Sequence, residues 1–106
     1  MNVNEYHILD ENGEPKVITD LMEWGKWMSK ANRPVADEMV GDSRVSTVFL
    51  GLDHAWGDSP PLVWETLVFG GEHDGEMERC GGSRKNAEEM HKRMVEGVKE
   101  AHDNSI

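Results

Sequence analysis

Apolar and β-branched residues crowd two segments, 44–52 and 62–69, and each segment predicts a β-strand. Successive side chains of a strand point to opposite faces, and both segments carry apolar residues on each face. In the first segment one face holds Val45 and Phe49 and the other holds Val48, Leu50 and Leu52. In the second segment one face holds Leu62, Trp64 and Val68 and the other holds Val63, Leu67 and Phe69. A strand that is apolar on both faces belongs at the centre of a sheet, so we expect these two strands to be the central pair.

Shorter runs of the same kind predict four further strands, each bounded by turn-forming residues. They span residues 5–9, 16–18, 35–40 and 77–80. Chain reversals next to the central pair are expected at Gly41-Asp42 and after Gly70. This arrangement predicts an antiparallel β-meander of about four to six strands.

A first amphipathic helix is predicted from about residue 20 to residue 31, where apolar residues recur at helical spacing. Thr19 or Asp20 is the expected N-cap, and Pro34 follows the end of the helix. Trp27 falls at the edge of the apolar stripe. It either covers the border of the core or anchors a partner protein.

A second helix is predicted from Ser83, its expected N-cap, to about residue 101. Its apolar stripe consists of Ala87, Met90, Met94, Val98 and Ala101. His91 borders this stripe, and we expect it to be a packed histidine rather than a ligand. Gly97 weakens a helix by about 1 kcal/mol relative to alanine, so we expect it to serve close packing.

Together these elements predict an α+β fold in which both helices pack on one face of the meander. The 106 residues suit a single domain, residues 1–106, with one core. No apolar run approaches the roughly 20 residues of a membrane span, and no signal-peptide pattern opens the sequence, so we expect no membrane association. The one cysteine, Cys80, has no partner for an internal disulfide, which indicates a reducing cytoplasm.

The chain has a formal net charge of −10, and most of this charge is concentrated in one segment. Residues 35–78 contain ten carboxylates and a single basic residue, Arg44. In a meander, the reversal at Gly41-Asp42 and the loop after Gly70 emerge at the same end of the sheet. We therefore expect one acidic patch at that end, formed by Asp42, Glu72, Asp74 and Glu76, with Asp37 and Glu38 nearby.

An acidic patch has two interpretations. Strongly acidic surfaces keep a protein soluble, and many need no further explanation. A clustered acidic face also repels nucleic acid and attracts the basic grooves of proteins that bind nucleic acid. On the second interpretation the protein binds another protein in competition with DNA or RNA, and does not bind nucleic acid itself.

A competing hypothesis places a small-molecule or divalent-metal site in the polar loop of residues 53–61. Asp53, His54 and Asp58 carry donors for a divalent ion, and Trp56 lies between them in the sequence. The loop matches neither the calcium-loop pattern nor HExxH, and aspartates at such positions commonly stabilise turns. We therefore expect no metal and no cofactor.

Catalytic motifs are missing from the sequence. It contains no GxSxG, no phosphate-binding glycine loop and no nucleophile–base pair at a familiar spacing. Glu65 interrupts an apolar row, and we expect it near a sheet edge, opposite a polar residue or Arg44, rather than in catalysis. A spatial assembly of His54 with Glu65 or Asp58 stays open, so a non-catalytic protein is favoured over an enzyme without settling the question.

Four stretches of the chain resemble a group of small proteins encoded by bacteriophages and prophages. They are DLMEW (Asp20–Trp24), RVSTVFLGLDH (Arg44–His54), PPLVWETLVFGG (Pro60–Gly71) and DGEM (Asp74–Met77). The resemblance runs from about Tyr6 to the last helix. It implies a phage origin and expression in a bacterial cytoplasm, but it carries no established activity that would assign a role to any residue.

These observations lead to one functional hypothesis. We expect a small acidic accessory protein that binds a host protein without catalysis and inhibits a nucleic-acid-binding or defence factor through its carboxylates. The expected contact residues are Asp37, Glu38, Asp42, Glu72, Asp74 and Glu76, with Trp27 and Trp56 as aromatic anchors or as contacts of a homodimer.

Overall fold

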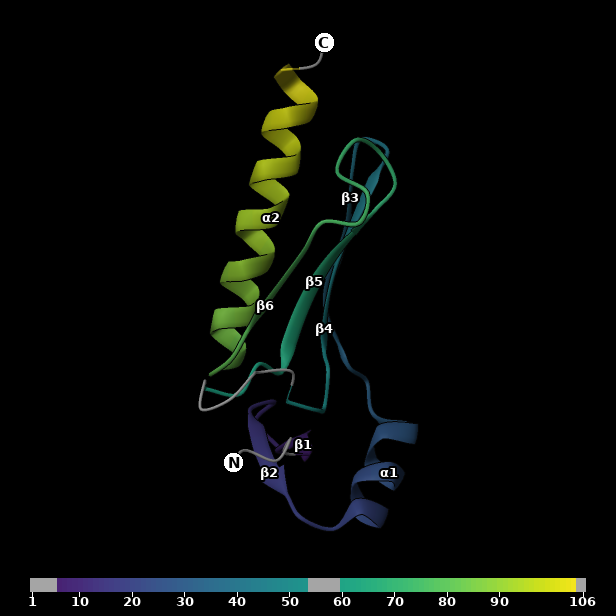
Figure 1. The fold of residues 1–106 in the computed structure, drawn as a ribbon, viewed down its shortest axis with the longest axis vertical. Helices are drawn as coiled ribbons and strands as arrows, with labels where there is room; N and C mark the ends of the chain where they lie inside the picture. The colour runs from purple at the N-terminus through teal and green to yellow at the C-terminus, as the bar shows by residue number, and fades with distance from the viewer. Residues whose placement is uncertain (1–5, 54–59, 105–106) are drawn as a thin grey trace.

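A computed structural model of the chain describes residues 6–53 and 60–104 (Figure 1). The elements in chain order are β1 (Tyr6–Leu9), β2 (Pro15–Ile18), α1 (Leu21–Lys30), β3 (Pro34–Val40), β4 (Ser43–Phe49), β5 (Trp64–Phe69), β6 (Met77–Cys80) and α2 (Arg84–Asn104). Strands β3 to β6 form a four-stranded antiparallel sheet in sequence order, and β1 pairs with β2 in a separate hairpin. The predicted α+β class and the antiparallel meander are confirmed, and β4 and β5 are its two central strands.

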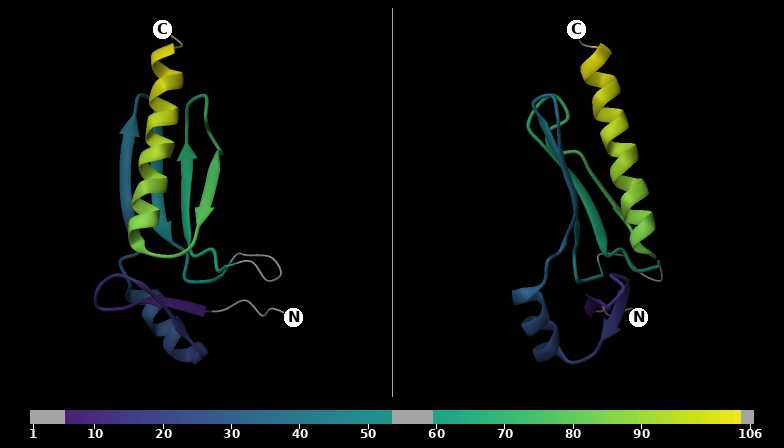
Figure 2. Two further views of the ribbon diagram at one scale, coloured as in Figure 1. Left: turned by 90° about the vertical axis from the view of Figure 1, so that its left-hand side faces the viewer. Right: turned by 180° about the vertical axis from the view of Figure 1, so that it is seen from behind.

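Of the two helices in the described part of the chain, one covers the four-stranded sheet. Helix α2 lies along one face, which we call the covered face, and contacts all four strands (Figure 2). Ser43, Val45, Thr47 and Phe49 of β4 alternate towards this face and are buried, as are Trp64, Thr66 and Val68 of β5. The opposite side of the sheet, which we call the open face, has no helix or strand packed on it among the described residues.

The position of α1 differs from the expectation that both helices share one face. Helix α1 packs on the β1–β2 hairpin and lies on the side of the sheet away from α2 (Figure 2). Its apolar stripe is used there: the Trp24 ring lies 4.9 Å from that of Tyr6, and Trp24 Nε1 donates to the Gly51 carbonyl. The same carbonyl accepts the His7 amide, so one peptide group joins the hairpin, α1 and the end of β4.

The sheet has two distinct ends. The first end, which we call the foot, is where β4 finishes and β5 starts, next to the hairpin and α1 (Figure 1). The second end, which we call the rim, consists of the β3–β4 turn at Gly41-Asp42 and the β5–β6 loop of residues 70–76. The molecule is elongated along this direction, measuring 51 × 30 × 20 Å. Its radius of gyration of 15.1 Å exceeds the ~13 Å typical of a compact chain of this length.

Two apolar clusters fill the space between the sheet and α2. The cluster at the foot contains Phe49, Val63, Trp64, Ala87 and Met90, and the cluster nearer the rim contains Val45, Val68 and Val98. The foot cluster is aromatic, with ring centroids of Phe49 and Trp64 5.1 Å apart and edge-on. The buried members of the rim cluster are all valines, and the partly buried Met94 packs against them, so this cluster contains no aromatic ring.

The predicted starts of both helices are confirmed, whereas α2 runs to Asn104, beyond its predicted end near residue 101. Asp20, rather than Thr19, caps α1, because its side chain accepts the amides of Met22 and Glu23. Helix α2 begins directly after Ser83, and the carboxylate that accepts its Arg84 amide comes from Glu14 in the distant β1–β2 turn. The positive end of the helix dipole also stabilises a carboxylate at this position.

Gly97 does not serve close packing as expected. It is exposed on α2, and a Cβ built there would meet no atom within 4 Å. The glycine therefore costs helix stability without a steric reason in this fold.

Candidate functional site

The two reversals that form the rim are held against each other. Ser43 Oγ donates a hydrogen bond to the Gly70 carbonyl at 3.0 Å. Gly70 has a φ of +80°, and a Cβ at this residue would lie 2.8 Å from the Asp42 carbonyl oxygen. Only glycine combines this backbone conformation with such a close approach. The sequence therefore brings two turns, about 30 residues apart, into contact at one end of the sheet.

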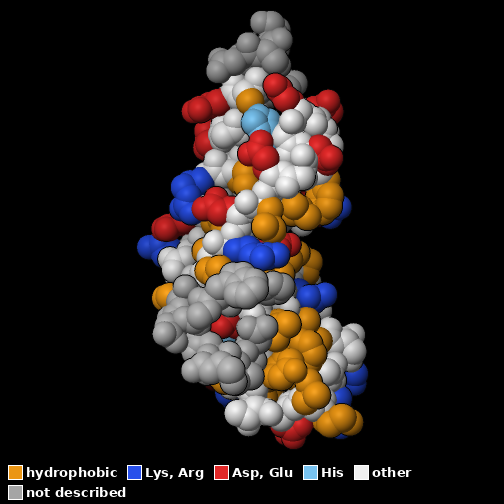
Figure 3. All heavy atoms as spheres, in the orientation of Figure 1, with side chains coloured by type: hydrophobic (Ala, Val, Ile, Leu, Met, Phe, Trp, Pro, Cys, Tyr) orange, Lys and Arg blue, Asp and Glu red, His pale blue; other side chains and the backbone are white. Residues whose placement is uncertain are grey.

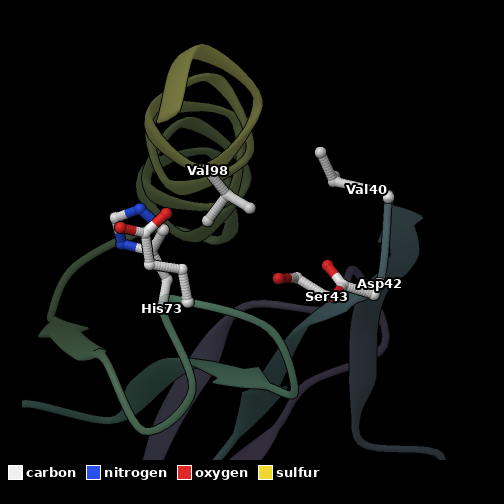
Figure 4. Close-up of a pocket in the computed structure, with 7 residues that line it drawn as sticks. Val40, Asp42, Ser43, His73 and Val98 are labelled. Carbon is white, nitrogen blue, oxygen red and sulfur yellow. The ribbon is translucent and has the colours of Figure 1, made fainter. Parts of the chain in front are cut away.

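A hollow opens between this rim and α2. This hollow, which we call the rim cleft, has a volume of about 400 Å³ and is lined by Val40, Gly41, Asp42, Ser43, Glu72, His73 and Val98 (Figure 4). Asp42 and Ser43 face Val98 of the helix and His73 of the β5–β6 loop across it (Figure 4). The valine side chains make part of the lining apolar, and the carboxylates of Asp42 and Glu72 make it acidic. Such a mixture is typical of a small binding site.

The remaining acidic residues of the rim surround the same loop. Asp74 and Glu76 are exposed neighbours of Glu72, and acidic side chains cluster around one imidazole in the upper part of Figure 3. The Asp74 carboxylate accepts the Gly70 amide at 2.7 Å, which shapes the loop. The Glu76 carboxylate bonds His73 Nδ1. The four predicted rim carboxylates are thus together, and two of them also order the loop.

His73 is the most informative side chain of the rim. A carboxylate only accepts hydrogen bonds, so Nδ1 carries the proton shared with Glu76. The other ring nitrogen, Nε2, is buried, and no described atom bonds to it. In the neutral ring this atom is an acceptor, and leaving it without a donor costs about 1–3 kcal/mol. His73 also separates the rim cleft from a second hollow under α2 that is lined by Glu76, Glu78 and Arg93.

Asp37 and Glu38, which were expected near the rim, lie in β3 a few residues before its turn at Gly41-Asp42. They point to opposite faces of the sheet, opposite Ser46 and Val45 respectively. On the open face, Arg44 donates to both oxygens of Asp37, with 2.6 Å from Nη2 to Oδ2. These hydrogen bonds hold the pKa of Asp37 below its usual value and raise the pKa of Arg44.

Glu38, whose side chain is half exposed, bonds to a buried polar chain that sequence reasoning missed. Its carboxylate bonds His91 Nε2 at 2.8 Å, His91 Nδ1 bonds the Thr47 hydroxyl at 2.8 Å, and Thr47 bonds the Thr66 hydroxyl at 2.5 Å. Thr47, Thr66 and His91, which we call the polar layer, lie between the foot and rim clusters. The available signal was a threonine in the middle of the inward row of each central strand.

The polar layer joins a hydroxyl, an imidazole and a carboxylate, as nucleophilic enzymes do. Both threonine side chains are fully buried, so no substrate atom can reach the hydroxyls. The chain instead cross-links α2 to the centre of the sheet. His91 is packed as predicted, and the arrangement supports structure rather than catalysis.

Trp27 and Trp56 were predicted as aromatic anchors for a partner protein, and the structure describes only Trp27. Trp27 is half-buried and packs edge-on against Phe49 at the foot, with ring centroids 5.7 Å apart. It therefore covers the border of the core, which was one of its two predicted roles. Trp56, the other predicted anchor, lies outside the described residues.

Of the loop of residues 53–61, the predicted small-molecule or metal site, the structure describes only the two ends. Asp53 is buried and accepts the Leu62 amide at 3.0 Å, as expected of a turn-forming aspartate. His54 and Asp58 lie outside the described residues. Within residues 6–53 and 60–104, no three His, Cys, Asp or Glu side chains are arranged to hold a metal ion.

Two further predicted positions have clear surroundings. Glu65 lies in central strand β5 and pairs with Arg79 of the edge strand β6 at 2.9 Å, not with Arg44. Cys80 lies in β6 as predicted, half-buried against the foot cluster, and this burial raises the pKa of its thiol. A thiol in this state is a poor nucleophile.

Neither helix in the described part of the chain is both long and apolar enough to cross a membrane.

Comparisons with known proteins do not assign the chain to a family. No protein-family model matches the sequence, and no curated protein or solved structure matches it at a significant level.

Proposed function

We propose that this protein is a non-catalytic binding protein whose rim cleft receives a lysine or arginine side chain from a basic segment of another protein. The observation that carries the proposal is the meeting of Asp42 and Glu72, from two separate reversals, in one hollow with valine walls. Lysine and arginine combine an aliphatic stem with a cationic tip. The stem suits Val40 and Val98, and the tip suits the carboxylates.

The surroundings of the cleft support the same partner chemistry. Asp74 and Glu76 add negative charge beside the cleft, and the net charge of −10 draws basic partners towards the protein from a distance. Each feature favours a basic polypeptide over nucleic acid, whose phosphates the rim repels.

The resemblance to phage-encoded proteins extends the proposal to a class of partner. The partner is a bacterial host protein with a basic groove that ordinarily holds DNA or RNA, and the acidic rim occupies that groove. Inhibition of the host factor follows from simple competition. Because the attraction is electrostatic and exposed, it weakens as salt rises.

A titration of the isotopically labelled protein tests the cleft directly. The probe is a short peptide that contains lysine and arginine, with an acidic peptide of equal length as a control. We expect amide shifts at Gly41, Asp42 and residues 72–75 with the basic peptide only, and we expect them to fade above about 0.5 M salt.

A matched pair of charge-reversal variants completes the test. Asp42→Lys/Glu72→Lys removes the acidic lining of the cleft, whereas Glu88→Lys/Glu89→Lys makes the same charge change on exposed positions of α2 away from the rim. Only the first variant should lose the peptide and the host protein captured from a low-salt bacterial lysate. Equal loss in both variants would mean that net charge, not the cleft, drives binding, and the proposal would be wrong.

A further inference from the structure

The open face of the four-stranded sheet is partly apolar, and none of the described residues forms an element that covers it. Met39, Phe69 and Met77 are 63%, 44% and 49% exposed there, next to the half-buried Val48 and Leu67. The strand register places Met39 and Phe69 on either side of Arg44, and Leu67 beside Met77. Sheets normally bury such a face against another layer, because exposed apolar patches are costly in water.

The charge on this face is balanced, unlike that of the rest of the chain. It carries two cations and two carboxylates, which form two ion pairs within the chain, Arg44–Asp37 and Arg79–Glu65. The Arg44 guanidinium also lies 5.6 Å from the centre of the Phe69 ring. The face is therefore neutral, while the remainder of the chain carries the whole net charge of −10. Two copies of the chain can therefore meet through this face without bringing like charges into direct contact.

From this juxtaposition we propose that the open face is the interface of a symmetric homodimer, with the two sheets stacked face to face. Two-fold symmetry allows two arrangements: the foot of one copy lies either against the foot or against the rim of the other. Helix α1 stands at the foot on the open-face side of the sheet (Figures 1 and 2), so two copies placed foot to foot would collide there. The foot-to-rim arrangement avoids this collision.

Charge complementarity favours the same arrangement. Helix α1 carries exposed Lys26 and Lys30 in its second half, whereas its carboxylates, the N-cap Asp20 and Glu23, lie at its start. The foot-to-rim dimer brings these lysines of each copy next to the acidic rim of the other, which includes Asp74 and Glu76. The rim cleft opens towards α2 on the covered side, so dimerisation leaves it free for the partner proposed above.

The size of the face sets the expected affinity. Seven-residue strands about 23 Å long, in a sheet about 19 Å wide, give a planar area of roughly 400 Å² per copy. The two copies together contribute about 800 Å² of planar area, so side-chain relief and the α1 contact must raise the buried area to the roughly 1,200 Å² of a small specific interface. We therefore expect a dissociation constant in the micromolar range, and an elongated monomer at high dilution.

Sedimentation velocity between about 1 µM and 500 µM tests the proposal, with circular dichroism to confirm folding. Met39→Glu/Met77→Glu places two charges on exposed positions of the open face and should weaken dimerisation at least about tenfold. Val17→Glu, at a position 48% exposed on the separate hairpin, is the matched control and should dimerise like the wild type. Phe69→Ser provides a second, uncharged disruption of the interface.

The outcomes separate this proposal from the one for the rim. A wild-type chain that stays monomeric up to 500 µM would overturn the dimer, as would a folded Met39→Glu/Met77→Glu variant that dimerises like the wild type. The same variant should still bind the basic peptide, since its rim is unchanged. Loss of peptide binding in Asp42→Lys/Glu72→Lys, together with peptide binding retained in the weakly dimerising Met39→Glu/Met77→Glu variant, would support both proposals independently.

Discussion

The apolar cluster at the foot and the one near the rim both lie between β4, β5 and α2, yet they are packed very differently. At the foot, α2 meets β4 and β5 through Phe49, Trp64 and Met90, and Trp27 of α1 closes the cluster from outside. At the rim the same elements meet through valines, and a cleft of about 400 Å³ remains. Large side chains fill the foot, so the rim can stay open to a ligand without endangering the fold.

The polar layer separates these two regions and gives each a defined position. Thr47, Thr66 and His91 satisfy one another inside the core. Hydrogen-bonded groups in an apolar interior specify one register, because any slip leaves them unpaired. We infer that this layer fixes α2 on the sheet so that Val98 and the loop of residues 70–76 stand at a constant separation.

The largest expected effect comes from truncating each cluster in turn. Phe49→Ala should lower the free energy of unfolding by about 3–5 kcal/mol, the usual cost of deleting a buried aromatic ring. Val68→Ala in the rim cluster removes two methyl groups and should cost about 2 kcal/mol. Urea denaturation followed by tryptophan fluorescence measures both, and equal losses would remove the distinction between foot and rim.

The next effect concerns the polar layer between them. Thr47→Val keeps the shape of the side chain but leaves the Thr66 hydroxyl and His91 Nδ1 without their partner. Burying such groups unpaired costs about 1–3 kcal/mol. Ser46→Ala removes the neighbouring hydroxyl on the open face and serves as the control, with a change within about 0.5 kcal/mol. If both variants unfold at the same urea concentration, the layer does not hold α2.

A smaller effect is expected where the hairpin ties down the start of α2. Glu14→Ala removes the carboxylate that accepts the Arg84 amide and should cost about 1 kcal/mol, as for other helix caps. Glu11→Ala changes an exposed residue of the same turn and should be neutral. Thermal unfolding measures stability, and the Arg84 amide resonance reports the bond itself. An unshifted resonance in Glu14→Ala would show that this contact is absent in solution.

The smallest effect is stabilising and lies at the rim end of α2. Gly97→Ala should raise the free energy of unfolding by about 0.5–1 kcal/mol, because the site has room for a Cβ and alanine favours the helix. Gly82→Ala should do the opposite, since Gly82 has a φ of +74° and its Cβ would collide with Asn86. Differential scanning calorimetry distinguishes the two. A destabilised Gly97→Ala would indicate a packing role for this glycine after all.

Much of the fold was predictable from local patterns. The apolar content of both faces of residues 44–52 and 62–69 identified the central strands, and Asp20 and Ser83 marked the two helix starts. Strand order then followed from short reversals, and with it the meeting of Asp42 with Glu72 at one rim. These predictions succeeded because alternation, capping and tight turns depend on residues close together in the chain.

Other features depended on distances that no local pattern contains. Asp37 and Glu38 are adjacent in the sequence, yet one pairs with Arg44 on the open face and the other with His91 on the covered face. The sequence showed that the two side chains point to opposite faces of the strand. It did not show which partner lies within hydrogen-bond distance of each carboxylate. The same holds for Glu65, whose pairing with Arg79 rather than Arg44 depends on β6 lying beside β5.

The sequence by itself determined the elements, their order and the accumulation of carboxylates at one end, because each follows from short-range periodicity and from turns. Only the tertiary structure decided that α1 leaves the sheet, that Thr47 and His91 bond inside the core, and that His73 keeps a buried nitrogen without a described partner. The physical reason is that hydrogen bonds and side-chain packing act over a few ångströms in space. Two residues 44 positions apart can interact in this way only after the chain has folded.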